Sequence, residues 1–138
     1  MDLKAVAVLF PFLLNFILLF NRKKKWAKSS LRWLLVLIMF CSGLILLFSK
    51  NIMNIEAPKI VIWGIMTPLI FSIIDYMFKM LSFSIHSRDL HLWVRGSSDI
   101  DDSKLSGGKH VRASDRIFSM IMLFLVLFLP FLGIVILK

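Results

Sequence analysis

Residues 117–137 form an unbroken run of 21 residues without a charged side chain. As an α-helix, this run is about 31 Å long, which matches the bilayer's hydrocarbon core of about 30 Å. A chain segment inside lipid has no water to bond its backbone, so a single segment of this kind must be helical. The run therefore predicts a helix that crosses a membrane, and the rest of the chain must be compatible with a bilayer.

Three more apolar runs precede this one, and the four predicted spans cover about residues 5–20, 31–48, 60–80 and 117–137. The first is short, about 24 Å as a helix, but Lys4 and Arg22 flank it and can extend their charged ends to the interface. A cleaved signal peptide is the alternative there, although the positive charges follow the apolar run instead of preceding it. With 59% hydrophobic residues in 138, the sequence predicts an all-α membrane protein: one integral membrane domain of four transmembrane helices in a small bundle.

Lysine and arginine are concentrated in two of the segments between the spans. Residues 21–32 carry six of them and residues 79–116 carry seven, whereas the opposite side of the membrane receives only four. The positive-inside rule places both basic segments in the cytoplasm and both termini outside, in a multi-pass protein of the cell (inner) membrane. The net charge of +9 is accounted for by this topology, so we expect no nucleic-acid partner.

The first basic segment is also a candidate contact for membrane lipids. Cations beside an anionic leaflet each gain about 1 kcal/mol, so the hairpin is expected to lie against anionic headgroups. The residues expected to make this contact are Arg22, Lys23, Lys24, Lys25 and Lys28.

The segment of residues 84–116 is the only sizeable polar part, and its basic and acidic residues nearly balance. Because apolar residues are embedded in it, we expect an ordered loop lying against the membrane that binds a partner. Alternating Leu90, Leu92 and Val94 fit a strand, whereas Ser87 as a cap and Gly96 as a stop fit a short helix equally well. Of the two alternatives for residues 86–96, we expect the helix. The candidate partner-binding residues are Arg88, Asp89, Leu90, His91, Leu92, Trp93 and Arg95.

Small and polar residues recur at steps of three or four along the third span, so a helix gathers them on one face. Two interpretations are open: a packing seam with Asp75 and Lys79 at the inner interface, or a hydrated path with Asp75 as a proton site. We hypothesise that the Asn15 amide on the first span donates a hydrogen bond to Asp75. The candidate intramembrane polar cluster is Asn15, Thr67, Ser72, Asp75 and Lys79.

The spacing of the residues that could bind a metal or act in catalysis does not match the spacing that such sites require. His86 and His91 are five residues apart, which places them on different faces of a helix, so a metal site that adds His110 is not expected. No nucleophile and base occur together at lipid depth. We therefore expect no enzyme activity, no metal and no cofactor.

The leading functional expectation is a non-enzymatic membrane protein. It would act as a homo-oligomer or as the accessory subunit of a larger assembly, with the loop of residues 84–116 facing a cytoplasmic partner. The first alternative is a small ion channel, transporter or membrane-permeabilising effector that uses the Asp75 stripe. The second is an intramembrane enzyme acting on lipids.

Overall fold

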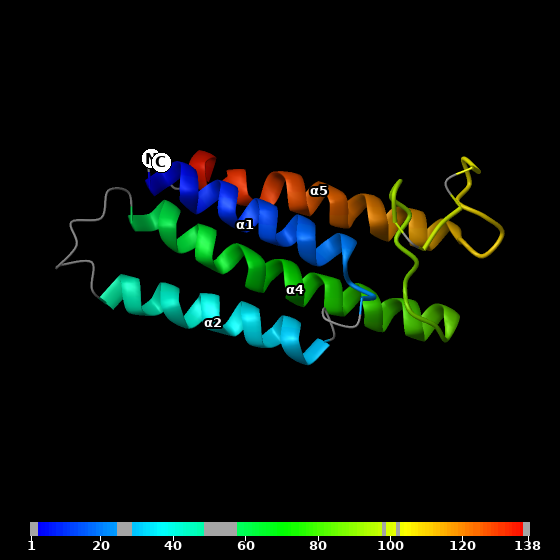
Figure 1. The fold of residues 1–138 in the computed structure, drawn as a ribbon, viewed down its shortest axis with the longest axis horizontal. Coiled ribbons are helices and arrows are strands. Elements are labelled where there is room, and N and C mark those ends of the chain that lie inside the picture. The colour runs from blue at the N-terminus through cyan, green and yellow to red at the C-terminus, as the bar shows by residue number, and fades with distance from the viewer. Residues whose placement is uncertain (1–2, 25–28, 49–57, 98, 102, 137–138) are drawn as a thin grey trace. The chain divides into compact units, whose positions relative to one another are not determined.

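The computed structural model describes residues 3–24, 29–48, 58–97, 99–101 and 103–136. These residues form an all-α fold, a four-helix bundle (Figure 1). The helices are α1 (Leu3–Phe20), α2 (Ser29–Phe48), α4 (Pro58–His86) and α5 (Ala113–Ile136). The prediction of four helices is therefore confirmed, and the connecting loop runs over residues 87–112, shorter than the predicted residues 84–116.

Two of the helices are long and apolar enough to cross a membrane. They are the segments Lys59–His86 and Ala113–Ile136. The other two helices contain shorter apolar segments, Ala5–Phe20 and Ser30–Ile45. The structure thus supports two candidate membrane spans by length and composition, and two shorter apolar helices beside them.

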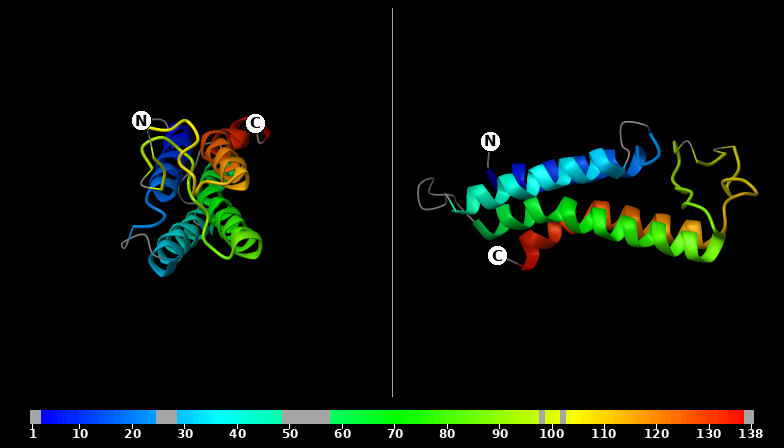
Figure 2. Two further views of the ribbon diagram at one scale, coloured as in Figure 1. Left: turned by 90° about the vertical axis from the view of Figure 1, so that its right-hand side faces the viewer. Right: turned by 90° about the horizontal axis from the view of Figure 1, so that it is seen from below.

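The chain divides into two compact units. The first comprises Met1–Ser72 and Val126–Lys138, and the second comprises Ile73–Leu125. In the first unit, α1 and α4 run in one direction while α2 and the end of α5 run in the other (Figures 1 and 2). In the second unit, the end of α4 and the start of α5 carry the loop, and Phe78 stacks on Phe118 with ring centroids 4.9 Å apart.

Helix α4 is the element on which the other helices of the first unit pack, and glycines make these contacts close. A Cβ atom added to Gly64 would lie 2.0 Å from the Ala7 carbonyl oxygen of α1. One added to Gly43 of α2 would lie 2.1 Å from the Ile65 side chain. The absence of a side chain at these positions is what lets the helices approach to this distance.

The contact between Ala7 and Gly64 sets the register of two parallel helices. Counting on in steps of four, Pro11 falls level with Pro68, and Asn15 falls level with Ser72. These four residues are buried. The small and polar faces of the first and third predicted spans thus meet along one seam within the first unit.

The contact between α4 and α5 includes a hydrogen bond from a side chain. The Trp63 indole Nε1 donates to the Leu129 carbonyl oxygen at 2.8 Å, one residue before Pro130. The Trp63 ring lies against Gly133, one helical turn farther along α5. A partly buried indole N–H is stabilised by such a partner, and the missing side chain at Gly133 leaves room for the ring to lie this close to α5.

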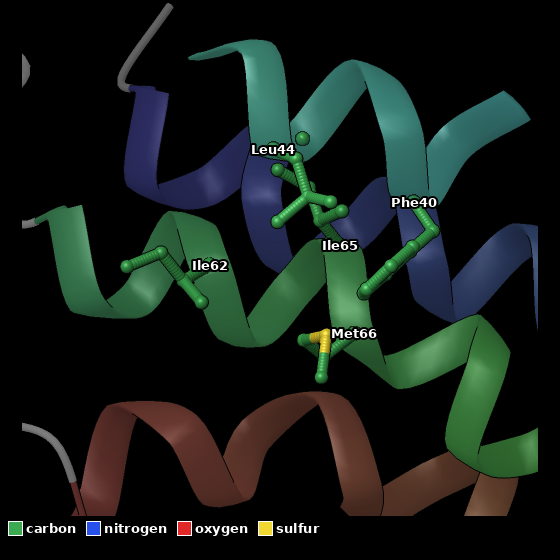
Figure 3. A pocket seen from close by; sticks show the side chains of 6 residues that line it. Phe40, Leu44, Ile62, Ile65 and Met66 are labelled. Atoms are coloured by element: carbon green, nitrogen blue, oxygen red, sulfur yellow. The ribbon is translucent and has the colours of Figure 1, made fainter. Parts of the chain in front are cut away.

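Helices α2 and α4 pack through aliphatic and aromatic side chains (Figure 3). The gap between them is about 10 Å³, enough for no more than about one water molecule. The residues that line it are all apolar: Phe40, Gly43, Leu44, Ile62, Ile65 and Met66. This is a packing gap and not a ligand site.

Polar side chains lie inside the molecule, while large apolar ones cover its outside. Asn15 and Thr67 are fully buried, and Ser72 is only 2% exposed. On the outer faces of α1 and α2, by contrast, Phe10 is 54% exposed and Ile38 is 56% exposed. Apolar residues such as Val8, Leu18 and Phe71 are buried beside these polar ones. The departure from a water-soluble bundle, whose outer faces are polar, is the large number of apolar side chains on the outside.

Candidate functional site

The folded loop, residues 87–112, is organised around Asp115 in the first turn of α5. Asp115 is fully buried. Its Oδ2 accepts hydrogen bonds from Arg88 Nη2 at 2.7 Å and from the Arg112 backbone N at 2.9 Å. Its Oδ1 accepts from the His91 backbone N at 3.3 Å and from Arg88 Nη1 at 3.4 Å. A buried carboxylate is tolerable only with such partners, and the positive end of the helix dipole adds to them.

Arg88 ties the start of the loop to its end. Besides Asp115, its guanidinium donates to the Asp89 carbonyl oxygen at 3.0 Å and to the His110 carbonyl oxygen at 3.1 Å. It also contacts His91 Nδ1. One side chain therefore binds backbone carbonyls 21 residues apart in the sequence.

Ser119 holds the middle of the loop against α5. Its hydroxyl accepts a hydrogen bond from the Trp93 backbone N at 2.8 Å and donates to the His91 carbonyl oxygen at 3.3 Å. The Leu92 backbone N donates to Asp99 Oδ2 at 3.0 Å. Side chains thus satisfy this backbone, while the Leu90 and Leu92 side chains are buried.

The prediction of a short helix between Ser87 and Gly96 is wrong. Residues 87–97 are irregular, because their backbone groups bond to side chains instead of to a helical turn. Ser87 has φ 55° and terminates α4 instead of starting a new helix. Gly96 has φ 83° and lies in a turn closed by the hydrogen bond from Ser97 N to the Val94 carbonyl oxygen at 2.9 Å. Both residues therefore mark a change in the backbone, but Ser87 ends α4 and Gly96 forms a turn within the loop.

The histidines form contacts with arginine, serine and backbone groups. His86 Nε2 lies 2.5 Å from Ser114 Oγ, and Arg112 Nη1 lies 2.7 Å from His86 Nδ1. Because arginine can only donate, His86 Nδ1 must accept, and Nε2 then carries the proton that is donated to Ser114. This tautomer cannot take a proton from Ser114, so the pair is not an activated nucleophile.

The described residues contain no group of three metal-ligating side chains. His91 and His110 pack edge to face with centroids 5.1 Å apart, and His110 Nε2 donates to the Asp99 carbonyl oxygen at 2.8 Å. The loop histidines thus serve as hydrogen-bonding and packing groups.

Most candidate partner-binding residues turn out to build the loop. Arg88 binds Asp115, and Leu90 and Leu92 are buried. Trp93 is half-buried beneath Arg116, whose guanidinium carbon lies 5.6 Å from the ring centroid. Of the seven candidates, Arg95 is the one fully on the surface, and Asp89 and His91 are partly exposed.

The candidate intramembrane cluster is divided between the two units. Asn15, Thr67 and Ser72 belong to the first unit, where Thr67 Oγ1 donates to the Trp63 carbonyl oxygen at 2.8 Å. The second unit contains Asp75, which is 5% exposed, and the half-buried Lys79. The hydrogen bond expected from the Asn15 amide to Asp75 is not formed, since the side-chain nitrogen and oxygen of Asn15 are buried without a hydrogen-bond partner in the part of the chain that the structure describes.

The basic hairpin begins directly at the end of α1. Arg22 is half-buried, and Lys23 and Lys24 are exposed. The turn is closed by the hydrogen bond from Lys24 N to the Asn21 carbonyl oxygen at 2.9 Å. Lys25 and Lys28 lie outside the described residues, so the lipid contact stays a prediction.

No family model, curated protein or solved structure matches this chain. Its function must therefore be argued from the site itself. The sequence patterns considered above identified neither Asp115 nor Ser119 as an anchor of the loop. The available signal was a carboxylate and a hydroxyl one helical turn apart at the start of the most apolar run, next to an arginine-rich segment.

Proposed function

We propose that this chain is a non-enzymatic integral membrane protein with four membrane-crossing helices. In this proposal it is an oligomer-forming or accessory subunit of the cell (inner) membrane, and the folded loop is its cytoplasmic interaction element. The observation that carries the proposal is the buried polar seam of the bundle together with its widely exposed apolar outer faces. Buried Asn15, Thr67 and Ser72 together with outward-facing Phe10 and Ile38 suit lipid and would be unfavourable in water.

The rigidity of the loop supports its role in binding. An ordered loop loses less conformational entropy on binding than a disordered one, so it is the better element for docking a partner. The hydrogen bonds of Asp115 and Ser119 supply this order from within the chain. We expect the partner to contact the exposed tip of the loop, which includes Lys109 and His110.

Topology can be tested with single cysteines in a Cys41→Ala background. New cysteines at Lys24, Lys59 and Lys104 occupy exposed positions. We expect those at 24 and 104 to react with an impermeant reagent from the cytoplasmic side, and the one at 59 to react only from the other side. Positions 24 and 104 reacting from opposite sides, or a monomer that stays folded in water without detergent, would contradict the proposal.

The subunit role is tested by cross-linking in native membranes. We expect products larger than the 16.0 kDa monomer, from self-association or from a partner. Exchanging the exposed tip residues, as in K109E/H110E, should weaken a partner product without changing membrane insertion. A monomer as the sole product would contradict the subunit role.

A small channel or transporter is the second candidate, and a specific observation favours it. Among the described residues, the Asn15 amide and the Ser72 hydroxyl are buried and make no hydrogen bond. Such groups are costly in an apolar interior and are compatible with a hydrated path. Ion flux through proteoliposomes that Asp75→Asn abolishes would establish this function, and a silent bilayer would exclude it.

A further inference from the structure

An open cavity of about 480 Å³ lies between the folded loop and α5 in the second unit. Its volume is within the range of about 300–1,000 Å³ that is common for small-molecule sites. One side is basic, with exposed Arg95 and Lys104, and the floor is apolar, with Met120 and Leu123 from α5. A ligand that fits both sides must combine negative charge with an apolar body.

The position of the cavity along α5 indicates where such a ligand comes from. Trp93 N bonds to Ser119 Oγ, and Ser119 lies four residues, or about 6 Å, beyond Asp115 along the helix. Leu123 lies about 6 Å farther again. The loop thus folds back along α5, so that its backbone is level with the start of the apolar run of residues 117–137. Cations from the loop and apolar side chains from α5 thus line one cavity, and they match the two parts of a lipid, a charged headgroup and its acyl chains.

Two exposed side chains agree with this placement. Leu105, on the rim, is 98% exposed, and Met120, on the floor, is 55% exposed. Large apolar side chains so open to the surroundings suit contact with lipid better than contact with water. Trp93, which also lines the cavity, is an aromatic residue of the kind enriched at the membrane interface.

We infer that this cavity binds an anionic glycerophospholipid from the cytoplasmic leaflet. The phosphate accepts from Arg95 and Lys104, and the acyl chains lie on Met120 and Leu123. Lys104 also pairs with Asp101 at 3.0 Å, but both side chains of that pair are solvent-exposed, so the lipid phosphate can compete for the lysine. The inference rests on the proposed membrane insertion and adds a specific lipid site to it.

The test uses the full-length protein in nanodiscs that contain mostly phosphatidylcholine with a minority of phosphatidylglycerol. Lipids that stay bound on release from the nanodisc are counted by native mass spectrometry. We expect retention of phosphatidylglycerol over phosphatidylcholine, and R95Q/K104Q should reduce this preference by about tenfold. The matched control, K59Q/K109Q, removes two exposed cations that do not line the cavity and lie outside the basic hairpin, so it should keep the preference.

Other outcomes separate the remaining explanations. Equal losses in R95Q/K104Q and K59Q/K109Q would mean general electrostatic attraction and would overturn the site. Competition by soluble glycerol phosphate would show a free-phosphate site and would overturn the lipid assignment. A dimer that carries no lipid would show that a second copy fills the cavity. In each of these cases the protein still requires a bilayer, so the proposed function stands even where the lipid site fails.

Discussion

Arg88 Nη2 lies 2.7 Å from Asp115 Oδ2, and this ion pair joins the first residues after α4 to the first turn of α5. The Asp115 side chain is fully buried, while that of Arg88 is 25% exposed. The carboxylate of this pair is therefore shielded from solvent. Removing one partner leaves the charge of the other without its counter-ion. The order of the whole loop depends on this pair.

Asp115→Asn should destabilise the protein by about 3 kcal/mol, because it leaves the Arg88 guanidinium in the loop core without its counter-ion. Thermal unfolding in detergent micelles measures the change, and limited proteolysis shows whether the loop opens first. The control is Asp101→Asn, which removes the same charge from an exposed pair within one turn and should lower the unfolding midpoint much less. Combining Asp115→Asn with Arg88→Met should cost less than the sum of the single changes, and strict additivity would show that the two residues are not coupled.

Ser119→Ala should destabilise the loop by about 1–3 kcal/mol, because the Trp93 backbone N–H loses its acceptor. Hydrogen exchange at the Trp93 amide should accelerate. Ser42→Ala is the matched control, since the Ser42 hydroxyl donates to the Met39 carbonyl oxygen within its own helix. Unchanged exchange at Trp93 in the Ser119 variant would contradict the anchoring role of this hydroxyl.

The helices could be predicted from the sequence because apolar periodicity and length are local properties. The α-helical class and the four helices follow from them, as does the small face that Gly64 shares with Pro68 and Ser72. The loop could not be predicted, because its backbone is satisfied by side chains distant in sequence. Trp93 bonds to Ser119, 26 residues away, and His91 bonds to Asp115, 24 residues away. No local period encodes such pairs, so a capping pattern at Ser87 was mistaken for the start of a helix.

Asp101 should stay ionised to a lower pH than an ordinary aspartate. Its pKa is lowered from 3.8 to about 2, chiefly by the hydrogen bond from the Ser103 hydroxyl and then by Lys104. A folded-state pKa below the unfolded one means that the turn is stabilised above about pH 4, and that this stabilisation is lost as the pH falls towards about 2. A carboxyl titration by NMR measures the pKa, and Ser103→Ala should raise it towards 3.8. An unchanged pKa in that variant would assign the shift to Lys104 instead.

Gly64→Ala should destabilise the first unit by about 1–3 kcal/mol, even though alanine is the better helix former. The new methyl group would lie 2.0 Å from the Ala7 carbonyl oxygen, and a backbone atom can move away only if α1 moves with it. Gly43→Ala is the matched comparison, because the group it meets is the Ile65 side chain, which can shift more easily than a helix backbone. Thermal unfolding in micelles should therefore rank Gly64→Ala as the more damaging change. A gain in stability from Gly64→Ala would mean that α1 and α4 do not meet at Ala7, and the register that sets Asn15 level with Ser72 would be lost with that contact.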